Sequence, residues 1–426
     1  MSAALRVLIV TDSFPPVCGG SGWSTWELSR GLTSRGHHVE VVLVEAGSRA
    51  SGVTEEAYEG QRVTRFSKAA PNVPVVRNIV KNEQLWAALT PYLAGRVRSN
   101  HGIDVIHAQH VMSTVPSIRA GHAADAPVVA TVRDYWPVCY WSDLIYDPTA
   151  SDLCPACTVG NMTKCVRPRG RGVPVAPWGV IPYMRANLRR KRQTLASADA
   201  VIAVSRAIGD DLRRRAPELA ATPFYTIPNP VDMTRLDAVF ERAPRPRAEP
   251  YVLYAGKIAT NNGAQFLIRA VKDAKIPWPL VVAGDGPLRP ALEAEARASG
   301  IALTVLGWIG REDAWAWMRH AALLAFPSYG PESLSRVLIE ASALGAPIAA
   351  MDTGGTRDIV TPEETGLLSA DPAGLARDLA RLAGDERLRA SLGAHARQEA
   401  RARFSAESVV DRVEQVYRSL LLPEAA

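Results

Sequence analysis

Short apolar runs alternate with segments of helical pattern along almost the whole chain, and this alternation restricts the fold more than any other feature. A first series of strand-like runs opens with "RVLIVTD" and closes with "FYTIPNP", and a second opens with "YVLYAGK" and closes with "PIAAMD". Strands that alternate with helices form parallel sheets with helices on both faces. The stretch "ERAPRPRAEP" between the two series is rich in proline and charge, which is typical of a linker. The sequence therefore predicts an α/β protein with two doubly wound domains.

Length and composition agree with this prediction. The 426 residues are enough for two or three domains, and 47% hydrophobic with 22% charged residues is typical of a soluble globular protein. No apolar run approaches the roughly 18 residues that a membrane span needs. The apolar core of "MSAALRVLIVTDSFPP" is too short for a signal peptide. We expect a cytoplasmic protein, either free or peripheral on the inner face of the membrane.

The net charge of +6 is concentrated in the segment 164–192, which has nine lysines or arginines and no acidic residue. Ile181, Met184 and Leu188 recur there at helical spacing, next to a basic face. Such a helix either contacts an anionic membrane or a phosphorylated acceptor, or packs its apolar stripe on its own domain. Nucleic acid is not an expected partner, because no known binding module is present.

Two carboxylates flank a short apolar run in "YGPESLSRVLIEASALGAPIAA". Glu332 and Glu340 are eight positions apart, which on a helix means a rotation of about 80° and a rise of about 12 Å. They cannot form a touching acid and base pair. Two carboxylates at this spacing can hold opposite ends of one elongated ligand at a helix N-terminus.

Several loops that follow expected strands carry residues suited to phosphate. Gly19 and Gly20 follow the first strand, Lys257 follows "YVLYAG", and Gly284 follows "PLVVA". Parallel sheets bind ligands beyond the carboxyl ends of their strands, where helix N-termini supply free N–H groups. Each loop alone is more often a simple turn, and the argument rests on several of them meeting at one rim of the second domain.

The segment "PSYGPESLSRVLIEASALGAPIAAMDTGG" is similar to the signature of family 4 of the retaining glycosyltransferases, with two glutamates eight apart and a closing Gly-Gly. Further similar stretches are "FPPVCGGSGWSTWELSRGLTSRGHHVEVV", "DVIHAQH", "AVIAVSRAI", "IPNPVD" and "YAGKIATNNGAQFLIRAV". The resemblance covers nearly the whole chain. It implies the GT-B architecture, in which two Rossmann-like doubly wound domains face a central cleft.

The resemblance also implies how the chain is divided. The expected parts are an N-terminal acceptor domain, 1–232, with a cysteine-containing insertion at about 135–180, a linker, 233–249, a C-terminal nucleotide-sugar domain, 250–405, and a final helix, 406–426, that returns to the first domain.

The implied activity is transfer of a sugar, with retention, from a nucleotide-sugar donor such as a UDP- or GDP-sugar to a glycan, lipid-linked or small-molecule acceptor. No metal is expected in catalysis. By resemblance, Glu340 binds the ribose, Glu332 the transferred sugar, and Lys257 the leaving diphosphate. The residues expected in catalysis are Glu332, Lys257, Arg133 and Asp134. Those expected to bind the donor are Gly19, Gly20, Lys257, Asn262, Gly284, Ser333, Leu334, Ser335 and Glu340.

Two positions depart from the family pattern. Asn262 stands where the family usually has lysine, which removes a cation from the expected diphosphate site. Arg133 stands where relatives commonly have histidine. It either pairs structurally with Asp134 or another carboxylate, or binds an acidic group of the donor sugar or acceptor. These departures leave an alternative function open, that of a catalytically weak relative which serves as a nucleotide-sugar sensor or an assembly scaffold.

Four of the five cysteines fall within a short segment. They are Cys139, Cys154, Cys157 and Cys165. Two cysteines two residues apart with flanking partners fit a structural zinc site, although the spacing is not that of a standard finger. The alternative is four reduced thiols in a loop-rich insertion. Disulfides are disfavoured in a cytoplasmic protein.

Overall fold

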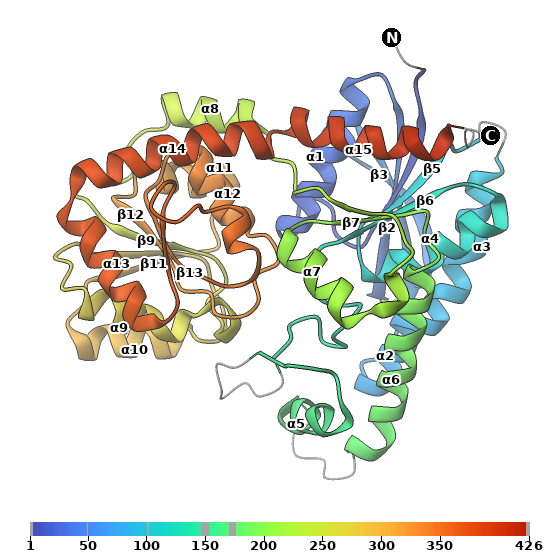
Figure 1. Cartoon of the computed structure of the whole chain (residues 1–426), viewed down its shortest axis with the longest axis horizontal. Coiled ribbons are helices and arrows are strands. Elements are labelled where there is room, and N and C mark those ends of the chain that lie inside the picture. Colours follow the sequence, from blue (N-terminus) through green and yellow to red (C-terminus); the bar gives the residue numbers. More distant parts are fainter. Residues whose placement is uncertain (1–2, 49, 100–101, 146–152, 170–175, 423–426) are drawn as a thin grey trace. The chain divides into compact units, whose positions relative to one another are not determined.

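The structure is a computed structural model that describes residues 3–48, 50–99, 102–145, 153–169 and 176–422 (Figure 1). Packing divides the chain into two compact units. Unit 1 contains Met1–Ser142, Cys154–Pro230 and Ala406–Ala426, and unit 2 contains Asp143–Leu153 and Val231–Ser405. The chain therefore leaves the first unit, builds the second and ends in the first.

Unit 1 is built on an eight-stranded sheet in the order β3-β4-β2-β1-β5-β6-β7-β8. All neighbouring strands are parallel except β3 and β4, which form an antiparallel hairpin at one edge. The strands are β1 (Arg6–Thr11), β2 (His38–Ser48), β3 (Gly52–Tyr58), β4 (Gln61–Ala69), β5 (Val105–Ala108), β6 (Val128–Val132), β7 (Ala200–Ala203) and β8 (Phe224–Thr226). The chain order reverses between β1 and β5, and these two strands are neighbours.

Helices cover this sheet because its central strands are largely apolar, and every residue of β5, β6 and β7 is buried. The helical elements are α1 (Gly20–Ser34), α2 (Pro74–Ile79), the π-helix η1 (Val80–Gln84), α3 (Leu85–Val97), α4 (Val111–Ala124), α5 (Val159–Arg169), α6 (Ala176–Leu195), α7 (Arg206–Arg215), the 3-10 turn η2 (Pro217–Leu219) and α15 (Ala406–Leu421).

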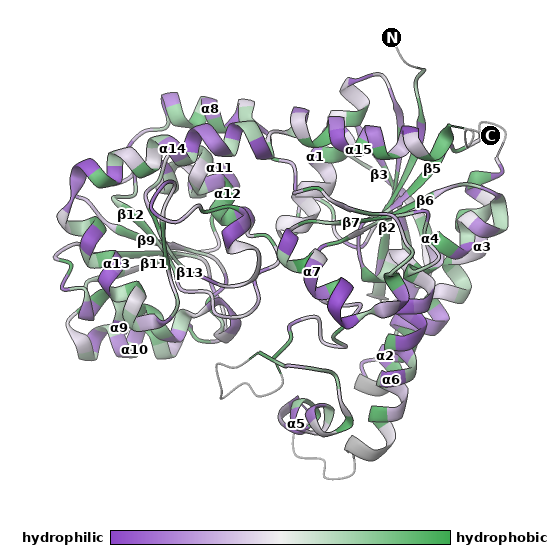
Figure 2. Cartoon of the chain, in the orientation of Figure 1, coloured by the Kyte–Doolittle hydropathy of each residue, from purple (hydrophilic) through white to green (hydrophobic). Residues whose placement is uncertain are grey.

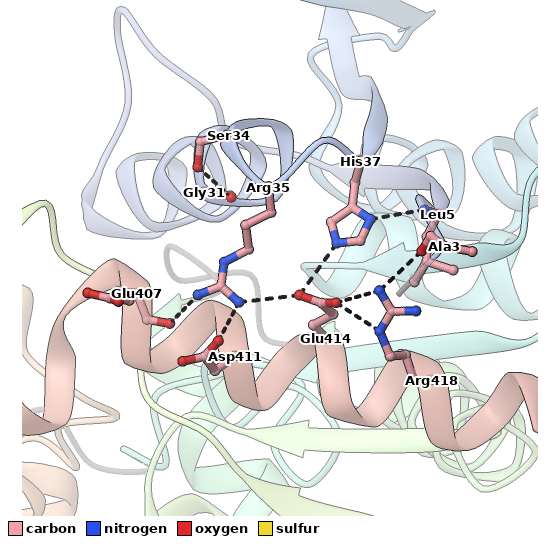
Figure 3. A network of polar contacts seen from close by, with 10 residues as sticks. All are labelled: Ala3, Leu5, Gly31, Ser34, Arg35, His37, Glu407, Asp411, Glu414 and Arg418. Carbon is pink, nitrogen blue, oxygen red and sulfur yellow. Dashed lines mark hydrogen bonds and ion pairs between the residues drawn. The ribbon is translucent and has the colours of Figure 1, made fainter. Parts of the chain in front are cut away.

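The last helix, α15, packs on α1 through an apolar stripe and a polar network (Figure 3). Val409, Val410 and Val413 are buried in the core of unit 1. At the rim of this stripe, the Glu414 carboxylate lies 3.3 Å from Arg35 and 3.4 Å from His37, and Arg35 also contacts Asp411. The polar network therefore fixes the helix at the surface, while the valines provide its buried contact.

Unit 2 has a six-stranded sheet in the order β11-β10-β9-β12-β13-β14, and all its neighbouring strands are parallel. The strands are β9 (Val252–Ala255), β10 (Leu280–Ala283), β11 (Leu303–Gly307), β12 (Leu323–Phe326), β13 (Ile348–Met351) and β14 (Leu367–Ser369). Here the chain order reverses between β9 and β12. The predicted fold of two doubly wound α/β sheets is confirmed.

The helices of unit 2 cover its sheet and meet at a core that includes Leu267, Leu280, Leu323 and Leu379. They are α8 (Met233–Arg242), α9 (Ala264–Asp273), α10 (Arg289–Ser299), α11 (Arg311–His320), α12 (Arg336–Ala343), α13 (Pro372–Gly384) and α14 (Glu386–Phe404), with the 3-10 turns η3 (Thr260–Asn262) and η4 (Gly354–Asp358). Figure 2 shows the hydrophobic strands in green and hydrophilic stretches on the helices in purple.

The range 233–249, expected as a linker, begins with helix α8. Asp232 caps this helix, since its carboxylate accepts the backbone N–H of Arg235 at 3.2 Å. The helix packs on its own unit, where Leu236 is buried and the Asp237 carboxylate accepts from Arg397 at 2.8 Å. The prolines correctly indicated irregular chain after α8. The cap and the apolar spacing, however, make the residues before that stretch helical.

The basic segment 164–192 forms the end of α5 and most of α6, apart from 170–175, which lie outside the described residues. The apolar stripe of α6 faces the protein. Ile181, Met184 and Leu188 are all buried, which confirms the interpretation of a solvated basic helix that packs on its own domain. This stripe is therefore not free to enter a lipid layer. Among the described residues, no helix is long and apolar enough to span a membrane.

Candidate active site

The carboxyl edge of the unit 2 sheet gathers several of the predicted donor-binding residues. Lys257 follows β9, and Glu332 follows β12, the neighbouring strand across the point where the chain order reverses. In parallel α/β sheets this reversal opens a crevice that ligands occupy. The Lys257 side chain is exposed at this edge, while the strands behind it are buried.

Gly284 belongs to this edge for a steric reason. Its φ of +152° and a Cβ position only 1.9 Å from the Gly256 carbonyl oxygen leave no room for a side chain. Two backbone hydrogen bonds of 3.0 Å join the loop after β9 to the loop after β10. The Gly256 N–H donates to the Ala283 carbonyl, and the Ile258 N–H donates to the Asp285 carbonyl. Gly284 therefore lets the loop after β10 pack against the loop that carries Lys257.

Glu332 lies in the loop after β12, and its surroundings raise the pKa of its carboxyl. Burial raises this pKa to about 6, although the Ser328 hydroxyl, 3.3 Å away, opposes the rise. The backbone carbonyl of Glu332 accepts the Gly355 N–H at 2.6 Å, and a Cβ on Gly354 would lie 2.2 Å from the same oxygen. The closing glycines thus hold the loop that presents Glu332.

Glu340 is on α12, and its carboxylate has two cationic partners. Its Oε1 accepts from Arg336 Nε at 2.7 Å and from Arg311 Nη2 at 3.3 Å. Glu340 is 6% exposed, so the arginines keep a buried carboxylate paired. Arg336 and Arg311 were not predicted as site residues. The first could have been found from its spacing of four on the helix, but Arg311 is distant in sequence.

The backbone of Ser333, Leu334 and Ser335 leads directly into α12. Ser335 caps the helix, since its hydroxyl accepts the Leu338 N–H at 3.4 Å, and Leu334 is buried beneath the turn. The first N–H groups of a helix have no partner within it and carry a partial positive charge. The three predicted residues therefore lie where the N-terminus of α12 can receive an anion.

Asn262 ends the 3-10 turn η3 next to this edge and is partly exposed. The adjacent Gly263 has a φ of +72°, and a Cβ there would lie 1.8 Å from the Pro327 carbonyl oxygen, in the loop after β12. The structure therefore places Asn262 at the predicted rim, with a neutral amide where the family usually has a cation.

In unit 1, Gly19 and Gly20 form the exposed start of α1. A Cβ on Gly19 would meet no atom of the described chain within 4 Å. The protein's own packing therefore does not require glycine at position 19.

Arg133 and Asp134 follow β6, and both are buried or nearly so. The terminal nitrogens of Arg133 donate to the side-chain carbonyls of Asn229 and Gln109, and the residue is 8% exposed. Asp134 accepts the Trp136 N–H at 2.8 Å, and burial raises its pKa to about 6. Two neutral amides therefore hold the terminal nitrogens of the guanidinium, and both earlier interpretations of Arg133, a structural ion pair or contact with an acidic ligand, stay predictions.

Among the described residues, the four clustered cysteines form no disulfide. The Cys154 thiol donates to the Ala156 carbonyl at 3.4 Å and the Cys165 thiol to the Met162 carbonyl at 3.3 Å, so each turns to its local backbone. Burial and the nearby sulfurs raise the pKa of Cys157 to about 12. Within the described ranges, no three histidine, cysteine or acidic side chains are arranged to hold a metal ion. The sulfurs of Cys139, Cys154, Cys157 and Cys165 nevertheless lie near enough to act electrostatically on one another, and a structural zinc stays a prediction.

Comparison with protein families decides the identity of the chain. The family described as Glycosyltransferase Family 4 matches residues 18–235, and the family described as Glycosyl transferases group 1 matches residues 249–385. The chain belongs to glycosyltransferase family 4. This glycosyltransferase therefore transfers a sugar from a nucleotide-sugar donor with retention, and the family resemblance inferred from the sequence is confirmed.

The similarity to curated relatives extends over most of the enzyme. It is 28% identical over 402 residues to a D-inositol 3-phosphate glycosyltransferase of Xylanimonas cellulosilytica, with 90% of this chain and 88% of the relative covered. It is 26% identical over 437 residues to a glycogen synthase of Mycobacterium tuberculosis, with 97% and 94% covered.

Solved structures share the fold of the whole glycosyltransferase. Sucrose-phosphate synthase from Thermosynechococcus elongatus matches with a TM-score of 0.68 at 22% identity, covering 98% of this chain and 99% of that one. HepE of Anabaena in complex with UDP matches with a TM-score of 0.67 at 18% identity, covering 97% and 100%. The predicted GT-B fold is confirmed.

Proposed function

We propose that this glycosyltransferase uses a UDP-sugar, that unit 2 binds this donor along its carboxyl edge, and that unit 1 binds the acceptor. The observation that carries the proposal is that Lys257, Glu332 and the N-terminus of α12 follow the two neighbouring strands between which the chain order of unit 2 reverses. A structural relative, HepE of Anabaena, was solved with UDP and with UDP-glucose, which supports uridine as the base.

Each group at this edge has a role in the proposed complex. The exposed ammonium of Lys257 and the N–H groups of 333–335 neutralise the diphosphate, on which charge develops as the glycosidic bond breaks. The free lone pairs of Glu340 accept the ribose hydroxyls, while Arg336 and Arg311 hold the carboxylate in place. Glu332 accepts a hydroxyl of the transferred sugar. No catalytic metal is needed for these roles.

The acceptor in this proposal is a glycan, a lipid-linked sugar or a small polyol. Curated relatives carry the names D-inositol 3-phosphate glycosyltransferase and 2-deoxystreptamine N-acetyl-D-glucosaminyltransferase, which name small ring acceptors. Peripheral contact of 164–192 with an anionic membrane would use the exposed basic side chains of α6, because Ile181, Met184 and Leu188 are buried.

Isothermal titration of the wild type with UDP, GDP and ADP tests the donor assignment. We expect UDP to bind most tightly, and Glu340→Ala to weaken UDP by about tenfold or more, since hydrogen bonds to a charged group are worth about 1.5–3 kcal/mol. Glu364→Ala, which removes an exposed glutamate of the same unit, is the matched control and should leave UDP affinity unchanged. Tighter binding of GDP or ADP than UDP would reject the uridine assignment.

A turnover assay distinguishes an active glycosyltransferase from a catalytically weak nucleotide-sugar sensor. Asn262 removes a cation from the rim, which is the feature that favours a catalytically weak relative. We expect UDP release from UDP-glucose, and Asn262→Lys to increase affinity for the nucleotide. UDP binding without any release of UDP from a panel of UDP-sugars and polyol acceptors would favour the sensor.

A further inference from the structure

The carboxyl edge of unit 1 also has a reversal of chain order, and two polar side chains meet there. Asp12 directly follows β1, and His110 follows β5, the neighbouring strand on the other side of the reversal. The Asp12 Oδ1 atom lies 3.4 Å from the His110 Nδ1 atom, and their side chains are 10% and 11% exposed. This is the position in unit 1 that corresponds to the loops of Lys257 and Glu332 in unit 2.

Buried polar atoms at this edge lack hydrogen-bond partners. Among the described residues, Asp12 Oδ1, His110 Nε2 and Gln109 Nε2 accept or donate no hydrogen bond. The other Asp12 oxygen accepts a long hydrogen bond of 3.4 Å from the Met112 N–H. Buried groups in native proteins are nearly always paired, and each exception costs about 1–3 kcal/mol. Three such atoms at a ligand-binding edge indicate partners that a ligand supplies.

The charges around these atoms indicate which ligand fits. The negative charge of Asp12 adds to the rise in the pKa of Asp134. Lys81 lies near enough to Asp12, and Lys191 near enough to Asp134, for each pair to interact electrostatically. Among the described residues, none of these four side chains forms an ion pair with another. Burial raises the pKa of Asp12 to about 7 and that of Asp134 to about 6, and it lowers the pKa of Lys191 to about 8, so the environment of these groups favours an uncharged ligand over an ion. The nearby Arg133 cation is held by the Gln109 and Asn229 amides. A hydroxyl both donates and accepts, so it satisfies groups of either sign.

We propose that Asp12, His110 and Asp134 form an acceptor subsite that binds hydroxyl groups of an uncharged polyhydroxylated ring, a sugar or a cyclitol. The proposal deepens the proposed function, because it rests on unit 1 as the acceptor-binding unit. Asp12 and Asp134 accept hydrogen bonds from ring hydroxyls, and Lys191 donates to one of them. His110 acts as a positioning residue whose Nε2–H donates to a further hydroxyl.

The state of His110 follows from its surroundings. Burial, and then the nearby Arg133 cation, lower its pKa to about 3, so the imidazole is neutral at physiological pH. A neutral imidazole has one N–H. The His110 side chain accepts the backbone N–H of Ser113, while Nε2 has no partner among the described residues, so Nδ1 is the acceptor and Nε2 carries the proton.

Binding of defined probes to the UDP-loaded protein tests the subsite. The probes are myo-inositol as an uncharged ring, D-inositol 3-phosphate as an anion and 2-deoxystreptamine as a cation, each followed by saturation-transfer NMR. The variants are Asp12→Asn, His110→Gln and Asp134→Asn. Asp210→Asn and His38→Gln, at exposed positions of the same unit, are the matched controls.

We expect myo-inositol to bind best and its dissociation constant to rise tenfold or more in each of the three variants, with the controls unchanged. UDP affinity and melting temperature, measured on every variant, show whether it is folded. Preference for the phosphate or the amine, or equal myo-inositol binding by folded variants and wild type, would overturn the subsite. Binding of myo-inositol without any binding of UDP would instead reject the donor proposal and leave the subsite standing.

Discussion

At the scale of single residues, the two glutamates of the donor edge differ in surroundings although they belong to one sequence motif. Glu340 is paired with two arginines, whereas Glu332 has one neutral hydroxyl partner and a pKa of about 6. An unpaired carboxylate is more easily protonated, and a protonated carboxyl accepts a hydroxyl less well. The pH dependence of the enzyme should therefore originate at Glu332.

We predict that turnover falls as the pH drops below about 6, because Glu332 then gains a proton and no longer accepts the sugar hydroxyl. Glu332→Gln should lower kcat by about tenfold or more and remove this acid limb. The raised pKa also means that the folded protein binds more protons than the unfolded chain between pH 4.5 and about 6, so this group lowers stability as pH rises through that window. The pH profile of kcat measures the effect.

Glu364→Gln is the control for Glu332, since this side chain is exposed and outside the donor edge. An acid limb that persists unchanged in Glu332→Gln would assign it to another group, of which Asp134 is the next candidate.

Arg133 shows how a departure from the family pattern can be structural. Its guanidinium is held by Gln109 and Asn229, so we predict that Arg133→Met destabilises the protein by about 2–5 kcal/mol by leaving those buried amides unpaired. Thermal unfolding measures the change, with the exposed Arg185→Met as control. The interpretation that Arg133 reads an acidic donor requires a different result, namely a stable variant that loses a preference for UDP-glucuronic acid over UDP-glucose.

At the scale of elements, the sequence predicted the central strands because parallel strands buried on both faces are continuous apolar runs. The hairpin β3 and β4 was missed, since β3 is exposed along nearly its whole length and has no apolar run. The donor loops could be predicted because their residues follow those strands directly. The contact of Arg311 with Glu340 and the contact of Asp12 with His110 could not be predicted, because only the order of the strands brings these residues together.

The helix α15 is an element whose attachment can be measured through one hydrogen bond. Tyr417 Oη lies 2.5 Å from His107 Nδ1, and both side chains are buried in unit 1. Burial lowers the pKa of His107 to about 3, so the partner is a neutral imidazole whose nitrogen would be left unpaired without the hydroxyl. We predict that Tyr417→Phe costs about 1–3 kcal/mol in the free energy of unfolding.

Urea unfolding of Tyr417→Phe should show this loss, and Tyr225→Phe, in β8 of the same unit, serves as the control. A variant as stable as wild type would mean that water replaces the hydroxyl, and that the valine stripe alone attaches α15.

At the scale of the whole molecule, the chain repeats one design with two different chemistries. Both sheets reverse their strand order once near the middle, and each reversal has loops with charged or polar groups at its carboxyl edge. The edge of unit 2 offers an exposed lysine and a helix N-terminus, which suit a diphosphate. The edge of unit 1 offers carboxyls and a neutral imidazole, which suit hydroxyls. These differences support the proposal that the donor binds to unit 2 and the acceptor to unit 1.

This division predicts where each ligand slows hydrogen exchange. UDP should protect the backbone amides of 256–263, 333–338 and 352–356, because those loops and the start of α12 are expected to contact the nucleotide, whereas the buried strands behind them already exchange slowly. Uridine, which lacks the diphosphate, should protect 256–263 far less than UDP does, since Lys257 would have no phosphate to hold. Adding myo-inositol to the UDP complex should then protect 110–114, at the start of α4 in unit 1. Mass spectrometry of the exchanged protein resolves these segments.

Equal protection of 256–263 by uridine and UDP would mean that the diphosphate lies elsewhere. Protection of 110–114 by UDP alone, with no further change on adding the ring, would contradict the assignment of donor and acceptor to separate units.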